Sequence, residues 1–104
     1  MDYKDWIYDL KLMLSIADTI RDAFLTDYVE IAHKNIWTNY YRLELDEKGE
    51  IPTTHVWAFD KQTKMATLHL AVTLFSNPDI NLEGKDVKDD RMIQRIVGSR
   101  IGYL

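Results

Sequence analysis

The chain has 104 residues, the size of one domain, and 46% of them are hydrophobic, so it can build one core and is not a disordered chain. It contains no cysteine, which excludes disulfides, thiolate metal ligands and a cysteine nucleophile. Its net charge of −4 disfavours binding to a phosphate backbone, because that binding depends on Lys and Arg. The first residues lack the pattern of a secretory signal, and the longest apolar run, 68–75, is too short to cross a bilayer. We therefore expect one cytoplasmic domain over 1–104 that binds no membrane.

The N-terminal segment 3–31 carries apolar residues at steps of three and four, which is the period of a helix with one buried side. Around Thr26 the sequence resembles a second helix start, because Asp27 stands at a capping position and Glu30 follows three residues later. The segment is therefore predicted to form one long helix, or two helices kinked near Thr26. The apolar positions on this predicted stripe are Tyr3, Trp6, Ile7, Leu10, Met13, Leu14, Ala17, Ile20, Phe24, Tyr28 and Ile31.

From Tyr40 onward apolar and polar residues alternate, which is typical of strands with one buried face. The turn Asp46–Glu50 is predicted to join two strands, with Gly49 at a position that requires a positive φ. A second tight turn is predicted at Asp60–Thr63. The three strands are expected at about 40–46, 53–59 and 64–75.

A last helix is predicted to start at Asp86 and to stop at Gly98, whereas residues 98–104 receive no assignment. Its apolar side would contain Val87, Ile93, Ile96 and Val97. The predicted fold class is α+β. It is a two-layer domain in which the N-terminal helix packs on a three-stranded antiparallel meander, with the short C-terminal helix beside it.

The titratable residues do not form a catalytic or metal-binding pattern. His33, His55 and His69 lack the close spacing of metal ligands, so structural roles are favoured, with His55 expected to face the hydroxyl of Tyr41. The sequence contains no nucleophile with a neighbouring acid–histidine set and no phosphate-binding glycine loop. We predict no catalytic residue, no metal ligand and no cofactor.

Five residues are predicted to bind a partner. Two are acids four positions apart on the predicted first helix, where paired acids mark a solvated face or a docking surface for a basic protein. Three are aromatic residues outside the predicted core face, which are typical of protein interfaces unless the C-terminal helix covers them. The five are Asp18, Asp22, Trp37, Tyr40 and Phe75.

These observations favour a non-enzymatic binding protein. The leading hypothesis is a small acidic inhibitor, such as an immunity or anti-defence protein, that neutralises a basic partner such as a nuclease toxin or a host factor. One alternative is a structural or oligomerising subunit that uses the sheet face or edge. Another is an enzyme or small-ligand-binding domain with a pocket around His55 and Tyr41.

Overall fold

The computed structural model describes residues 3–77 and 91–100. These residues form four α-helices and no strand, so the fold is all-α and the predicted α+β class is wrong. No helix in these two ranges is long and apolar enough to span a membrane. The elements are α1 (Lys4–Leu14), α2 (Asp22–Asn35), the π-helical turn η1 (Ile36–Tyr40), α3 (Lys61–Ser76), α5 (Arg91–Val97) and the 3-10 turn η2 (Gly98–Arg100).

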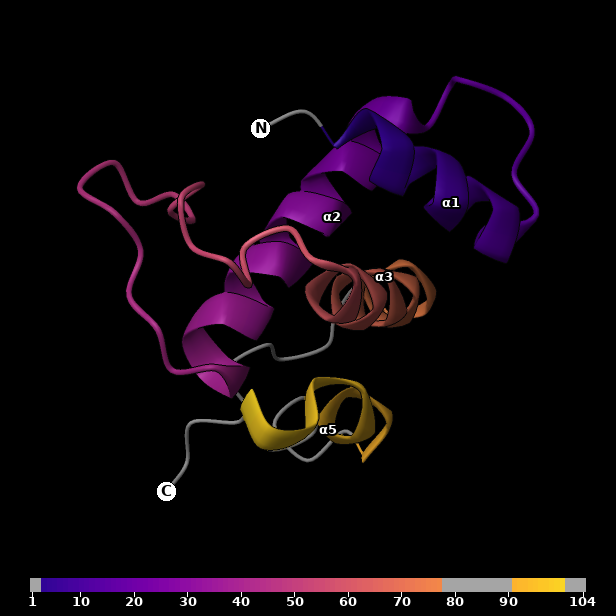
Figure 1. Ribbon diagram of the computed structural model, residues 1–104. Coiled ribbons are helices and arrows are strands. Elements are labelled where there is room, and N and C mark those ends of the chain that lie inside the picture. The colour runs from indigo at the N-terminus through magenta and orange to yellow at the C-terminus, as the bar shows by residue number, and fades with distance from the viewer. Residues whose placement is uncertain (1–2, 78–90, 101–104) are drawn as a thin grey trace.

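The helix α3 lies at the centre of the molecule and is seen nearly end-on in Figure 1. It packs against α2 over the largest contact, and also against α1 and α5, while α1 packs on α2 as well. The core is formed where these helices meet. Its buried apolar residues include Trp6 and Leu10 of α1, Leu25, Val29 and Ala32 of α2, Ala66, Leu70, Ala71 and Leu74 of α3, and Ile93 and Val97 of α5.

The segment predicted as the third strand is the helix α3. Asp60 precedes it and caps it, because its Oδ1 accepts a hydrogen bond from the backbone N of Thr63 at 3.0 Å. The tight turn predicted at Asp60–Thr63 is therefore the start of this helix. Buried positions of α3 recur at steps of three and four, as in other helices. Neighbouring helices cover α3 on several sides, however, so Leu68 and Val72 are apolar as well. These extra apolar residues obscure the helical period in the sequence.

The predicted N-terminal helix is interrupted well before Thr26. α1 ends at Ser15, which adopts a left-handed conformation with φ of 58°, and the backbone N of Ile16 donates to the carbonyl of Lys11 at 2.9 Å. A loop of residues 15–21 then leads into α2, so Thr26 and Asp27 lie inside a continuous helix. The sequence shows no glycine or proline at this break.

The segment between η1 and α3 contains turns where two strands were predicted. Arg42 has a φ of 56°, and this left-handed residue turns the chain back so that the backbone N of Leu43 donates to the carbonyl of Trp37 at 3.0 Å. The predicted turn at Asp46–Glu50 is confirmed: the backbone N of Asp46 donates to the carbonyl of Glu50 at 2.7 Å, and Gly49 has a φ of 75°. The turn forms without a strand ladder on either side of it.

The predicted C-terminal helix is confirmed in its described part. α5 buries Ile93 and Val97, and Gly98 follows it with a φ of 51°, as expected for a helix stop. The predicted helix start at Asp86 and the apolar residue Val87 lie outside the described residues.

Candidate functional site

The aromatic residues predicted to bind a partner lie in the core or pack against it. Trp37 and Tyr40 belong to η1, and both side chains are buried. The Trp37 Nε1 donates to the carbonyl of Glu44 at 3.0 Å. Phe75 is half-buried and makes an edge-to-face contact with Tyr28, with ring centroids 6.3 Å apart. Two of the three are therefore inaccessible to a partner in this structure, because the helices close around η1.

The two predicted acids occupy different environments rather than one helix face. Asp18 lies in the loop before α2, is exposed, and accepts a hydrogen bond from the backbone N of Ile20 at 3.1 Å. Asp22 is the first residue of α2, and its carboxylate binds the ammonium of Lys11 at 2.9 Å. The charge of Asp22 is thus already neutralised within the molecule, whereas that of Asp18 remains open to solvent.

A row of exposed residues runs along the side of α2 that faces away from the core. Ile20, just before the helix, is 86% exposed, Phe24 is 68% exposed, and Ile31 is also exposed. Asp27 lies between the last two and is exposed as well. Phe24, Asp27 and Ile31 follow one another at steps of three and four, so they lie on one side of the helix, and Ile20 precedes Phe24 by four residues in the loop before it. We call Ile20, Phe24, Asp27 and Ile31 the outer stripe.

The apolar members of the outer stripe were predicted to lie in the core, and this prediction is wrong. The error follows from the break at Ser15, because the prediction continued the same helical spacing across the break as if the helix were uninterrupted. The true inner side of α2 is set by Leu25, Val29 and Ala32, which are completely buried. Both rows have helical spacing, and only the position of the break decides which one faces inward.

The charge along the outer stripe is predominantly negative. Asp18 and Asp27 are exposed and form no ion pair with any other described residue. Glu30 is paired with Lys34 at 3.2 Å, and Arg21 is an exposed base beside the start of the helix. The outer stripe therefore combines apolar side chains with one unpaired acid, Asp27, and a second exposed acid, Asp18, lies beside its N-terminal end.

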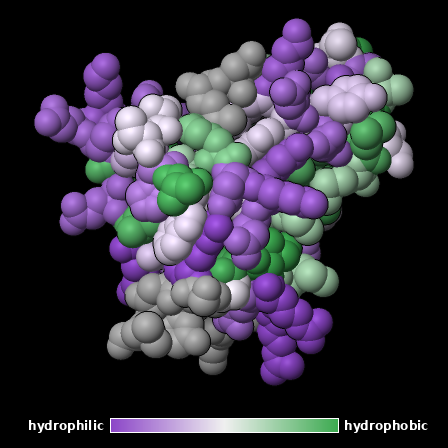
Figure 2. Space-filling view, in the orientation of Figure 1, coloured by the Kyte–Doolittle hydropathy of each residue, from purple (hydrophilic) through white to green (hydrophobic). Residues whose placement is uncertain are grey.

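A second apolar surface lies on α1. Tyr8 and Leu12 are separated by one helical turn and are 65% and 64% exposed, and Met13 beside them is exposed too. Figure 2 shows hydrophobic surface at the upper right, over α1 and the loop that follows it. The α1 and α2 helices thus carry most of the large apolar side chains that are exposed in the described ranges.

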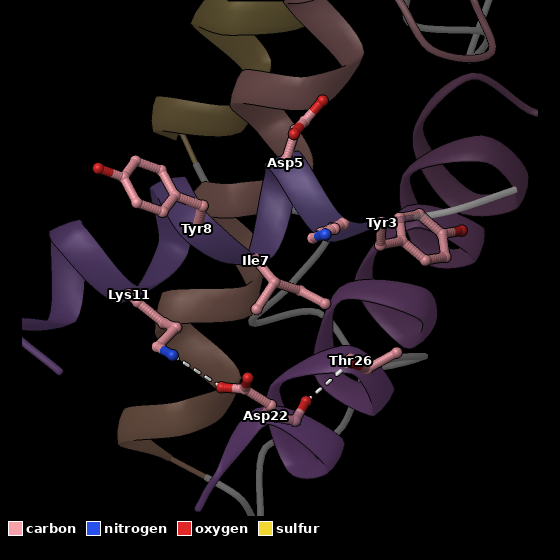
Figure 3. Close-up of a pocket in the computed structure, with 8 residues that line it drawn as sticks. Tyr3, Asp5, Ile7, Tyr8, Lys11, Asp22 and Thr26 are labelled. Atoms are coloured by element: carbon pink, nitrogen blue, oxygen red, sulfur yellow. Dashed lines mark hydrogen bonds and ion pairs between the residues drawn. The ribbon is translucent and has the colours of Figure 1, made fainter. Parts of the chain in front are cut away.

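An open groove of about 560 Å³ separates α1 from the first turns of α2. Lys11 reaches across it to Asp22, and Ile7 projects toward α2, whereas Tyr8 points away (Figure 3). The Thr26 Oγ1 donates to the carbonyl of Asp22 at 2.8 Å, so the polar groups at this end are already bonded to one another. The groove offers an irregular, mixed surface and no converging set of catalytic groups.

His33, on the inner side of α2, is the most unusual titratable residue of the core. The Tyr3 hydroxyl lies 2.8 Å from its Nδ1, and the carbonyl of Ala58 lies 2.6 Å from its Nε2. A carbonyl only accepts, so Nε2 carries the hydrogen, and the neutral ring accepts at Nδ1 from Tyr3. Burial lowers the pKa of His33 from 6.5 to about 4, against the opposing effect of the bond to Ala58. Burial, with the charges of Glu30 and Glu50, raises the pKa of Tyr3 to about 12.

The residues of the predicted ligand pocket are packed against other side chains. The Tyr41 hydroxyl lies 2.7 Å from the Oγ1 of Thr63 rather than bonding to His55. The His55 Nδ1 accepts from the backbone N of Trp57 at 3.0 Å, and its ring stands edge-on to Trp37. Within residues 3–77 and 91–100, no group of three His, Asp or Glu side chains is arranged to hold a metal ion.

No protein-family model, curated protein sequence or solved structure matches this chain.

Proposed function

We propose that this chain is a non-enzymatic protein-binding module that docks a basic partner through the outer stripe of α2. The observation that carries the proposal is the exposure of Ile20 and Phe24. Full burial of such a side chain lowers the free energy by about 1.5–3 kcal/mol. Ile20 and Phe24 do not gain this stabilisation within the fold, so a partner that covered them would gain it on binding. A helix that presents apolar anchors seven residues apart on one side, as α2 does with Phe24 and Ile31, has the arrangement that inserts into an apolar groove of another protein.

The acids of the stripe support a basic partner. Asp27 stands between the apolar anchors, and Asp18 stands at their N-terminal end, so a partner groove with Lys or Arg at its rim would complement both. A small inhibitor, such as an immunity or anti-defence protein that neutralises a nuclease toxin or host factor, is the class we propose. A cytoplasmic setting belongs to the proposal, because a cysteine-free chain needs no oxidising compartment.

The test begins with the full chain as bait, followed by purification of the captured protein and titration calorimetry. We expect Phe24→Ser to weaken binding at least tenfold, because it removes an anchor at the centre of the contact. Val56→Ser is the matched control: Val56 is 79% exposed but lies on the segment between η1 and α3. Equal affinities for the two variants would contradict the proposal.

The charge contribution is tested separately with Asp27→Lys. We expect this variant to bind more weakly, with a smaller effect at high salt because exposed charges are screened. Glu47→Lys makes the same change at an exposed acid of the Asp46–Glu50 turn and should leave affinity nearly unchanged. If both reversals weaken binding equally, the net charge matters and the stripe does not.

A further inference from the structure

The bond between Tyr3 and His33 fastens the N-terminal end of α1 to α2. Tyr3 precedes α1, His33 lies in the last turn of α2, and Ala58 belongs to the segment that leads into α3. The imidazole ring therefore joins three segments that are distant in sequence. It is fully buried, and its ring lies 4.9 Å from Trp6 and 5.2 Å from Phe59, measured between centroids.

We propose that protonation of His33 detaches α1 from α2, so that α1 opens at acidic pH while α2 and α3 remain packed. In the neutral ring both nitrogens are satisfied, one as donor and one as acceptor. Protonation places a second hydrogen on Nδ1, directed at the hydroxyl of Tyr3. Tyr3 then has to turn its own hydrogen away from the ring, and a positive charge is left in an aromatic, water-poor site.

The other charged groups near this contact are partly paired with one another. They therefore do not stabilise a charged His33 ring as water would. Two acids, Glu30 of α2 and Glu50 of the segment between η1 and α3, contribute to raising the pKa of Tyr3. Glu30 is bound to Lys34, and Lys34 and Glu50 line a small cavity of about 70 Å³ beside Tyr3. α3 contributes Lys64, whose ammonium is engaged by Asp9 of α1.

α1 is the element expected to open because it is the most weakly held of the helices around His33. It fully buries only Trp6 and Leu10, and its two ion pairs, Lys11–Asp22 and Asp9–Lys64, are partly exposed. α2 and α3 share the larger contact of the core. Opening of α1 would give His33 access to water, where the imidazolium is stable. The pKa of His33 is about 4 in the closed state and is expected to return to 6.5 when α1 opens. The equilibrium constant for opening should therefore be roughly 100-fold larger at pH 4 than at pH 7.

The experiment is amide hydrogen exchange on the full chain at pH 7 and pH 4, corrected for the intrinsic effect of pH. We expect exchange in α1 to rise roughly 100-fold at pH 4, with a much smaller rise in α3. His33→Gln keeps an amide that can donate and accept but does not titrate, so its α1 should show no acid-induced rise. His55→Gln and His69→Gln are the controls and should behave like the unaltered chain.

Tyr3→Phe provides a second test if His33→Gln does not fold. It removes the hydroxyl that bonds the neutral ring, so opening should begin at a higher pH than in the unaltered chain. The proposal is overturned if α1 and α3 lose protection together, if α1 exchanges equally at both pH values, or if Tyr3→Phe leaves the pH of opening unchanged. The proposal stands independently of the docking role of the outer stripe.

Discussion

The two sides of α2 carry similar side chains and have different consequences. The inner side, with Leu25 and Val29, is completely buried against α1 and α3, whereas the outer stripe leaves Phe24 and Ile20 largely exposed. Hydrophobicity alone does not distinguish the two rows. An apolar residue stabilises this fold only where a neighbouring helix covers it, and the uncovered row leaves its apolar surface open to solvent.

The largest difference between the two sides should appear in the free energy of unfolding. We expect Leu25→Ala to lower it by about 3 kcal/mol, because a completely buried leucine leaves a cavity. Phe24→Ala, one position away, should change it by less than about 0.5 kcal/mol. Urea unfolding of both variants measures the difference. Similar losses in the two variants would mean that the outer stripe is also part of the core.

We also expect the inner side of α2, through His33, to make the stability of the fold depend on pH. The pKa of His33 is lowered in the folded protein, so its contribution to stability is complete above pH 6.5 and is lost as the pH falls toward 4. A pKa lowered from 6.5 to about 4 corresponds to a loss of about 3 kcal/mol in the free energy of unfolding, and the full loss is reached only below pH 4. Urea titrations across pH 4–7 should show most of this loss in the unaltered chain and not in His33→Gln. A loss of equal size in His33→Gln would assign the effect to other groups.

The cap of α3 should have an intermediate effect, because α3 covers the inner side of α2. Although burial opposes it, hydrogen bonds from Arg100 and Thr63 hold the pKa of Asp60 below its ordinary value. We expect Asp60→Ala to lower the unfolding free energy by about 1–2 kcal/mol, through loss of the cap and of the ion pair with Arg100. Asp27→Ala, on the outer stripe, is the control. Its thermal unfolding should match that of the unaltered chain.

The smallest expected change in stability comes from residues at helix ends, which lie on neither side of α2. Arg42 and Ser15 both have left-handed backbones, with φ of 56° and 58°. Glycine adopts this conformation without a steric penalty but loses more entropy on folding, so Arg42→Gly and Ser15→Gly should each stabilise the fold by about 0.5 kcal/mol. Thermal unfolding measures the gain. A loss in either variant would show that the replaced side chain makes a stabilising contact.

Local signals in the sequence predicted the turns and stops that depend on glycine. Gly49 and Gly98 have the positive φ expected of them, and the helical periods of α1 and α5 were recognised. The breaks after α1 and α2 were missed because Ser15 and Arg42 carry no signal for a left-handed residue. The stop at Arg42 removed the first predicted strand, since the chain turns back there instead of extending.

The nonlocal features were not readable from one sequence. α3 resembled a strand because its apolar residues at 66, 68, 70, 72 and 74 alternate along the chain, in a helix that α1, α2 and α5 cover on several sides. The candidate site depended on the same information. Phe24 and Ile31 were placed in the core but are exposed, whereas Trp37 and Tyr40, predicted to bind a partner unless the C-terminal helix covers them, are buried. Of the five residues predicted to bind a partner, only Asp18 lies exposed beside the outer stripe.

The π-helical turn η1 makes the region after α2 sensitive to the number of residues as well as to their identity. A π-helical turn closes over more residues than an α-helical one, and here it brings Trp37, Tyr40 and Tyr41 together on the buried side. Deleting one residue from η1 would rotate everything after it by about 100° around the helix axis. The Tyr41 hydroxyl would then no longer reach the Oγ1 of Thr63 in α3.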